Sequence, residues 1–366
     1  MVDWLAGKRI KGTSTERTTT AGIGTGVGGW VELGRTTTGS ALSDFSVGSL
    51  ANKRYYMILT NIKGKSNSGV NWQTRMGNGT IDTSYSYSMR YSLDGGAVDD
   101  AGVNAQQIQS GTNPTSLPQF EVGYIANFST KEKLFMAHDV NQNTAGAGTA
   151  PQRGEYTGKY TLTSNPINII GATTSSAHTM STGSEMVVLG WDPADTHTNN
   201  FWTELDSVNA SGSPSTLNTN TFTAKKYLWI QIYAKNNNGA NYADWRIRFN
   251  GDTGNNYAMR QSYNGGSDTT YTSATPINYF GSYLEATGST LMNMFIINNS
   301  SNEKLAIIHT SGFSNAQSGA GFAPNRQEAV IKWTNISSQI TSMQIYRDSG
   351  SGTFGNESII KVWGSD

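Results

Sequence analysis

Short runs of apolar residues recur along the chain, and Gly, Asn and Ser separate them. Many residues in these runs are β-branched or aromatic, a composition typical of strands. Asp94-Gly-Gly and Asn264-Gly-Gly supply hairpin turn residues between runs. No stretch of about twelve residues repeats with a period of 3.6, apart from one short helical turn expected at Asp3-Trp-Leu. The clearest apolar runs are 55–59, 227–233, 291–297, 305–308, 340–346 and 358–363. The pattern therefore predicts an all-β protein.

Much of the sequence occurs twice, at a spacing of about 172 residues. The spacing varies only between 170 and 173 residues, so insertions and deletions are confined to short loops. We therefore expect two homologous domains. The residues expected at matching positions are Trp72 and Trp245, His138 and His309, and Glu185 and Glu357. Other repeated blocks are Trp30-Val-Glu-Leu and Trp202-Thr-Glu-Leu, Glu132-Lys-Leu and Glu303-Lys-Leu, and Pro151-x-Arg153-x-Glu155 and Pro324-x-Arg326-x-Glu328.

Each copy, at about 165 residues, is long enough to bury a core of its own. We place domain 1 at residues 29–193 and domain 2 at residues 200–366. The segment that joins them, residues 192–200, is polar and contains Pro193, as expected of a boundary. Each domain should be an antiparallel β-sandwich of about eight strands, similar in size to a jelly roll.

The composition excludes several classes of partner and chemistry. The 26 basic residues balance the 26 acidic ones, which argues against specific nucleic-acid binding or an anionic membrane as partner. The chain has no Cys, so disulfides, thiolate nucleophiles and Cys-bound zinc are excluded. No apolar run approaches 18 residues, so we predict neither a membrane span nor a secretion signal. We predict no cofactor.

Residues 1–28 belong to neither copy and are too poor in large apolar residues to fold alone. One interpretation is a flexible tail. The other is an extended arm that becomes ordered against another subunit, where Trp4, Leu5 and Ile10 would anchor it. We expect the arm, because its Gly-rich stretch before Trp30 gives reach without forming a core.

Several segments resemble one group of proteins. They are Leu5 to Arg17, Arg246 to Tyr257, the Asn302-Glu-Lys-Leu block and the Pro-x-Arg-x-Glu blocks. Together they are similar to structural proteins of tailed phages and other environmental viruses. The resemblance implies a capsid, decoration, tail or fibre component, located in the virion. It also implies contacts with other virion proteins. We further expect a homo-oligomer, because sandwich edges with few charges need partners or loops to cover them. These segments are signatures of a lineage and carry no chemistry of their own.

Two histidines are the strongest candidates for chemistry. His138 and His309 follow equivalent apolar runs, and a Pro-x-Arg-x-Glu block comes after each of them. Acid–base catalysis would require these side chains to converge in a cleft. The alternative is that His, Arg and Glu satisfy one another and hold the same strand pair in both domains. Duplication favours this structural role, because one active site usually suffices. We therefore predict no catalytic residue and no enzyme.

A second candidate is the loop that contains Asn250, Asp252 and Asn255, which is rich in oxygen donors. It lacks the residue order of an EF-hand and the closing bidentate Glu, so calcium binding has little support. Gly and Asn in such loops more often supply the positive φ of a turn between strands. We therefore predict no metal site.

Tyrosines form the third candidate group. If exposed on a sandwich rim, they could stack on the sugar rings of a host surface glycan. Alternation of Tyr with Ser also marks one face of a strand that packs on its neighbour, and we favour that interpretation. The residues concerned are Tyr85, Tyr87, Tyr91, Tyr263 and Tyr271. We therefore expect a structural virion protein, with a carbohydrate- or receptor-binding module on the particle surface as the alternative function.

Overall fold

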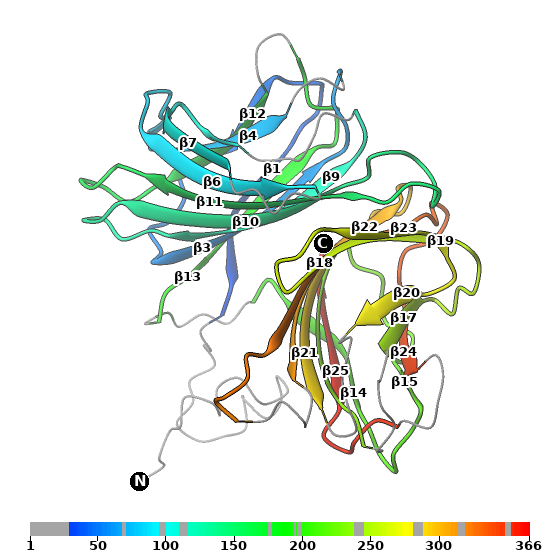
Figure 1. Ribbon diagram of the computed structural model, residues 1–366. Coiled ribbons are helices and arrows are strands. Elements are labelled where there is room, and N and C mark those ends of the chain that lie inside the picture. Colours follow the sequence, from blue (N-terminus) through cyan, green and yellow to red (C-terminus); the bar gives the residue numbers. More distant parts are fainter. Residues whose placement is uncertain are drawn as a thin grey trace.

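The computed structural model describes residues 29–67, 71–94, 100–109, 116–174, 178–193, 195, 200–237, 245–280, 288–313, 319–347 and 353–366. Every regular element in these residues is a β-strand (Figure 1). None of the described segments is a helix suited to crossing a membrane. The N-terminal arm with Trp4, Leu5 and Ile10, and the helical turn expected at Asp3, lie outside the described residues.

Domain 1 is a sandwich of two antiparallel sheets. Its large sheet has the order β1 (Val31–Thr37), β13 (Glu185–Trp191), β3 (Tyr55–Ile62), β9 (Gln119–Ala126), β10 (Lys133–Asn141), β11 (Gln152–Tyr160), β6 (Tyr87–Leu93) and β7 (Asp100–Ala105). Its small sheet has the order β2 (Asp44–Val47), β12 (Ile169–Thr174), β4 (Trp72–Asn78) and β5 (Thr80–Ile81), and β8 (Ile108–Gln109) also pairs with β4.

Domain 2 repeats this topology in its described strands, except that β5 has no counterpart and β20 takes the place of β8. Its large sheet has the order β14 (Thr203–Asn209), β25 (Ile359–Ser365), β16 (Tyr227–Lys235), β21 (Ser289–Ile297), β22 (Lys304–Phe313), β23 (Asn325–Trp333), β18 (Tyr257–Tyr263) and β19 (Thr269–Ala274). Its small sheet has the order β15 (Thr216–Asn218), β24 (Met343–Arg347), β17 (Trp245–Phe249) and β20 (Ile277–Phe280). The prediction of two tandem β-sandwiches is confirmed. The expected eight strands per domain were too few, since each large sheet alone has eight.

The two halves also match in detail, with one exception. Trp72 is the first residue of β4, and Trp245 is the first residue of β17, the corresponding strand of domain 2. Both side chains are buried in the cores of their domains. His138 lies opposite Glu155, and His309 lies opposite Glu328, in the same strand pair. The conserved register places these side chains on corresponding faces of the two sandwiches.

The predicted match of Glu185 with Glu357 is wrong. Glu185 lies opposite Asn61, and the corresponding position opposite Tyr233 is occupied by Ile359. Glu357 comes before β25 begins. The last strand is thus shifted by two residues relative to the alignment of the sequence blocks. Because a two-residue shift leaves the inward and outward alternation unchanged, the apolar pattern could not reveal it.

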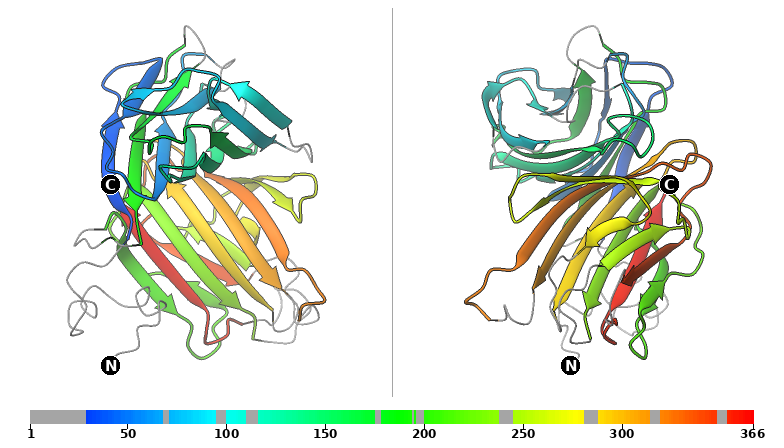
Figure 2. Two further views of the ribbon diagram at one scale, coloured as in Figure 1. Left: turned by 90° about the vertical axis from the view of Figure 1, so that its left-hand side faces the viewer. Right: turned by 45° about the vertical axis from the view of Figure 1, so that its right-hand side comes forward.

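The large sheets pack against each other through their outer faces, which are turned away from the small sheets. β10 of domain 1 contacts β22 of domain 2, and β9 also contacts β22. The two sheets meet at one end of each and diverge from there (Figures 1 and 2). A shared apolar cluster joins the domains, with Phe120 of domain 1 close to Tyr227 of domain 2 at a ring distance of 6.2 Å. This contact places the two repeated histidines side by side.

Candidate functional site

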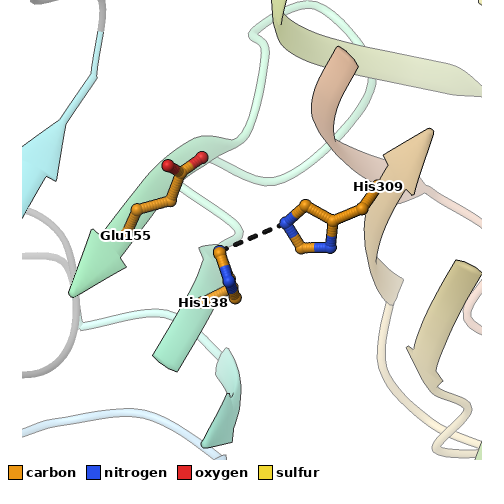
Figure 3. Close-up of side chains that lie close together, drawn as sticks. All are labelled: His138, Glu155 and His309. Atoms are coloured by element: carbon orange, nitrogen blue, oxygen red, sulfur yellow. Dashed lines mark hydrogen bonds between the residues drawn. The ribbon is translucent and has the colours of Figure 1, made fainter. Parts of the chain in front are cut away.

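A polar cluster lies inside the contact between the domains. His138 on β10 and His309 on β22 face each other, with Glu155 of β11 beside them (Figure 3). His138 Nδ1 and His309 Nε2 are 3.2 Å apart and share a hydrogen bond. Each of the three side chains has one atom able to ligate a metal, and these three atoms lie within 4.8 Å of one another. We call these residues, together with Arg153 and Glu328, the histidine cluster.

Arginines connect the cluster across the domain boundary. Arg153 of domain 1 forms an ion pair with Glu155 of its own strand. Its Nη2 donates to Asp268 of domain 2 at 2.9 Å, and its Nη1, which pairs with Glu155, lies 3.7 Å from Glu328 of domain 2. In return, Arg260 of domain 2 donates to the carbonyl of Pro151 at 2.9 Å. The Arg and Glu of the first repeated block therefore link the two domains.

Burial makes both histidines neutral at physiological pH. Burial, together with the nearby charge of Arg153, lowers the pKa of His138 to about 4. Burial likewise lowers the pKa of His309 to about 3, assisted by His138. Burial and the neighbouring Glu155 raise the pKa of Glu328. The space beside these groups is about 10 Å³, which is room for about one water molecule and for no organic substrate.

Two imidazoles and a carboxylate are donors that Zn²⁺ uses in proteins. In this arrangement, however, the two ring nitrogens bond each other and Arg153 pairs with the Glu155 carboxylate. A bound cation would have to replace the first contact and compete with the guanidinium for the second. The contacts therefore suit a structural link between the domains. This extends the structural role expected from the sequence, which foresaw the pairing within each domain but not the meeting of the two copies.

The oxygen-rich loop of domain 2 uses its oxygens internally. Asp252 accepts hydrogen bonds from Trp333 Nε1 at 2.7 Å and from the backbone of Gly254 at 2.8 Å. Asn250 has a φ of 50° and accepts from the backbone of Thr341 at 2.9 Å. Asn255 is exposed. The loop is therefore a turn between strands, held in place by the hydrogen bonds of Asp252 and Asn250.

The five candidate tyrosines do not form one surface. Tyr87 is wrong as a contact residue, because it is 1 % exposed, stacks on Tyr160 and donates its hydroxyl to the carbonyl of Met76. Tyr91 is half-buried, and its hydroxyl donates to Asp100 at 3.2 Å. Tyr85 is exposed, whereas Tyr263 and Tyr271 of domain 2 are half-buried. The favoured interpretation, strand packing, therefore holds for Tyr87 but not for Tyr85, which lies before β6 and is 70 % exposed.

Sequence reasoning missed a polar group inside domain 1. Glu121 on β9 and Asp139 on β10 lie opposite each other and are fully buried. Burial lowers the pKa of Lys65, also buried, to about 8, while Asp139 opposes this shift. Domain 2 carries Met292 and Thr310 at the matching positions. The signal in the sequence was a carboxylate inside the apolar strand segment at residues 119–125, which is unusual for a buried strand.

Sequence reasoning also missed an open apolar groove on domain 1. Its volume is about 560 Å³. Leu134 is 61 % exposed and Met136 is 50 % exposed, which is unusual for large apolar residues side by side on one sheet. Tyr55 stacks on Trp191 at a ring distance of 5.5 Å, and Trp30 lies 6.5 Å from Tyr124. We call this surface the domain 1 groove and define it by Trp30, Tyr55, Tyr124, Leu134, Met136 and Trp191.

The outer faces of the two sheets make contact through unlike halves. On the outer face of its large sheet, domain 1 buries the half that lies away from the groove. Domain 2 buries the half that corresponds to the groove of domain 1. Strand register fixes this match, because Met136 lies opposite Tyr124 just as Ile307 lies opposite Phe295. The buried residues of domain 1 are Leu59, Val122, Val140 and Val187, and those of domain 2 are Tyr227, Phe295, Leu305 and Ile307.

Each domain is left with one half that the other does not cover, and these two halves differ in polarity. The uncovered half of domain 2 carries polar residues at positions where domain 1 carries apolar ones. Gln231 of domain 2 lies opposite Asn293 and Lys361. The matching residue of domain 1, Leu59, lies opposite Val122 and Val187. In domain 1 the uncovered half is the groove, and it is apolar. The uncovered half of domain 2 is therefore the more polar of the two, although Leu291 is exposed on it.

No protein family matches the sequence, and no curated protein matches it. Among solved structures, the LG4–LG5 domains of the mouse laminin α1 chain are 9 % identical over 91 % of this chain and 89 % of that chain, with a TM-score of 0.21. The binding domain of botulinum neurotoxin serotype D/C is 11 % identical over 86 % and 94 %, with a TM-score of 0.15. Likenesses this low carry nothing about the function of this chain.

Proposed function

We propose that this protein is a structural subunit of a virus particle, which assembles through contacts with other copies of itself and with other virion proteins. The observation that supports the proposal is the domain 1 groove, an apolar surface that stays open, whereas the free half of domain 2 carries Gln231, Asn293 and Lys361. Exposing an apolar surface of this size to water is unfavourable unless a protein partner covers it. The resemblance of residues 5–17 and 246–257 to virion proteins favours a particle as the place of assembly.

The chemistry of the groove favours a protein partner over a sugar. Its residues offer aromatic and aliphatic surface, but no carboxylate or amide side chain lines it. To bind sugar hydroxyls, the groove side chains therefore offer hydroxyl groups, such as those of Tyr55 and Thr157, and the indole N–H groups of the tryptophans. The histidine cluster supports a role other than catalysis, because its polar groups engage one another in a space too small for a substrate.

Electron microscopy of intact particles tests this proposal. Density for the two sandwiches should occur at repeated, symmetry-related positions. Particles produced with a Met136→Asp variant should lack the protein, whereas a Leu291→Asp variant should be incorporated normally. Leu291 is the matched control because it is 54 % exposed on the polar free half of domain 2. Normal incorporation of both variants would contradict the proposal.

The alternative function is a carbohydrate- or receptor-binding module on the particle surface. The aromatic residues of the groove are the feature that favours it. A glycan array with the purified protein distinguishes the two functions. Binding to a defined glycan that Trp191→Ala abolishes would support the alternative, and no binding is expected of a purely structural subunit.

A further inference from the structure

Domain 2 shows how the surface that matches the groove is covered. Phe201 lies two residues before β14, is buried, and packs on Trp202 and Tyr227 at ring distances of 5.0 and 6.2 Å. The matching position in domain 1, before Trp30, is Gly29. The aromatic side chain that the preceding segment supplies to Tyr227 is therefore missing beside Tyr55. The groove is open partly for this reason.

The segment that precedes domain 1 carries apolar residues that have no core of their own. Trp4, Leu5 and Ile10 lie in the arm of residues 1–28. The arm joins the domain at Gly29, directly beside the groove residue Trp30. The 19 residue steps from Ile10 to Gly29 span up to roughly 60 Å when extended. That reach is enough to enter the groove of an adjacent molecule.

We propose that the domain 1 groove is the docking site for the N-terminal arm of a neighbouring copy, with Trp4, Leu5 and Ile10 as its apolar anchors. The inference rests on the proposed function, which requires contacts between copies. The free half of domain 2 is polar at Gln231 and Asn293, so the groove is the apolar surface suited to such a contact. A concave groove of about 560 Å³ also suits an extended segment with bulky side chains better than it suits a flat second sheet.

Photo-crosslinking in the full-length chain tests the proposal directly. Met136 is replaced by benzoylphenylalanine, and equal amounts of unlabelled and ¹⁵N-labelled protein are mixed before irradiation. Mass spectrometry should find Met136 joined to residues 1–12, with labelled and unlabelled peptides linked to each other. The same photoreactive residue at Leu291 is the matched control and should not reach the arm. Links confined to a single copy, or links to a strand of a second copy, would overturn the proposal.

Light scattering provides the second test. The combined Trp4→Ala, Leu5→Ala and Ile10→Ala variant and the Met136→Asp variant should each weaken self-association at least tenfold, while Leu291→Asp leaves it unchanged. Circular dichroism verifies that each variant is folded. A monomeric wild-type chain would overturn the proposal. Exclusion of Met136→Asp from particles without any cross-link to the arm would leave the proposed function standing and refute only the arm as the occupant.

Discussion

His138 and His309 meet as neutral rings because burial removes the water that would solvate a charged imidazole. The hydrogen bond between them needs one ring to donate and the other to accept, which two charged rings cannot do. The hydrogen bond between the domains therefore depends on the protonation state of the two histidines. The duplicated histidine is explained by this contact, because each copy supplies one half of the hydrogen bond.

The first prediction concerns pH. In the unfolded chain each histidine titrates near its ordinary pKa of 6.5, whereas the folded values are about 4 and about 3. Between these values the unfolded chain binds more protons, so stability should fall as the pH drops from about 6.5 towards 4. Thermal unfolding measured from pH 7.5 to pH 4.5 checks this. A His138→Gln/His309→Gln variant should lose much of the dependence, and His178→Gln should keep it.

The second prediction concerns Asp252. Removing its carboxylate leaves Trp333 Nε1 and the Gly254 amide without their acceptor, so Asp252→Ala should cost about 1–3 kcal/mol of unfolding free energy. Urea denaturation measures this cost. The exposed neighbour Asn255→Ala should have little effect. Calcium should not raise the melting temperature of the wild-type chain, and a rise that Asp252→Ala abolishes would contradict the turn role.

At the scale of the strands, the apolar pattern and the repeated blocks were enough to predict two tandem β-sandwiches. They were not enough to fix the register of β25, because its alternation is the same after a shift of two residues. They also could not reveal the site. Leu134 and Leu305 belong to identical sequence blocks, yet one is exposed and the other buried. Only the packing of the two sheets decides which copy of a repeated residue meets water.

The third prediction uses the register correction. The Glu185 carboxylate accepts from Lys226 Nζ and the Tyr227 hydroxyl, each at 2.7 Å, across the domain contact. Burial opposes ionisation, but these bonds and that from Thr37 lower the pKa of Glu185 overall. Its contribution is therefore present above its ordinary pKa of 4.5 and lost as the pH falls further.

At pH 7, Glu185→Gln should cost about 1.5–3 kcal/mol of unfolding free energy, since charged hydrogen bonds are replaced by neutral ones. Glu357→Gln is the control. That residue is exposed and pairs with Lys235, so its substitution should leave the unfolding curve unchanged. Equal effects of the two substitutions would mean that the register of β25 described above is incorrect.

At the scale of the whole molecule, the two domains use the same fold in unequal ways. Domain 1 contributes the buried half with Val122, and domain 2 contributes the opposite half with Phe295. The fourth prediction follows from this difference. Val122→Asp places a charge inside the contact and should cost about 4 kcal/mol or more. Asn293→Asp at the matching half-buried position should be nearly neutral, because a carboxylate can still accept the hydrogen bonds from Trp229 and Gln231. Chemical denaturation of both variants measures the difference.

A contact between unlike halves of one fold has no built-in end. Identical domains joined in this way would add to one another without limit, or until a ring closed. Gln231, Asn293 and Lys361 stop the series after two domains, because a third domain would have to bury these polar groups, including the Lys361 ammonium and its exposed partner Glu204. The uncovered half of domain 2 thus prevents the addition of a third domain. Restoring the residues of domain 1 there, as Gln231→Leu, Asn293→Val and Lys361→Val, should reopen that end and produce filaments.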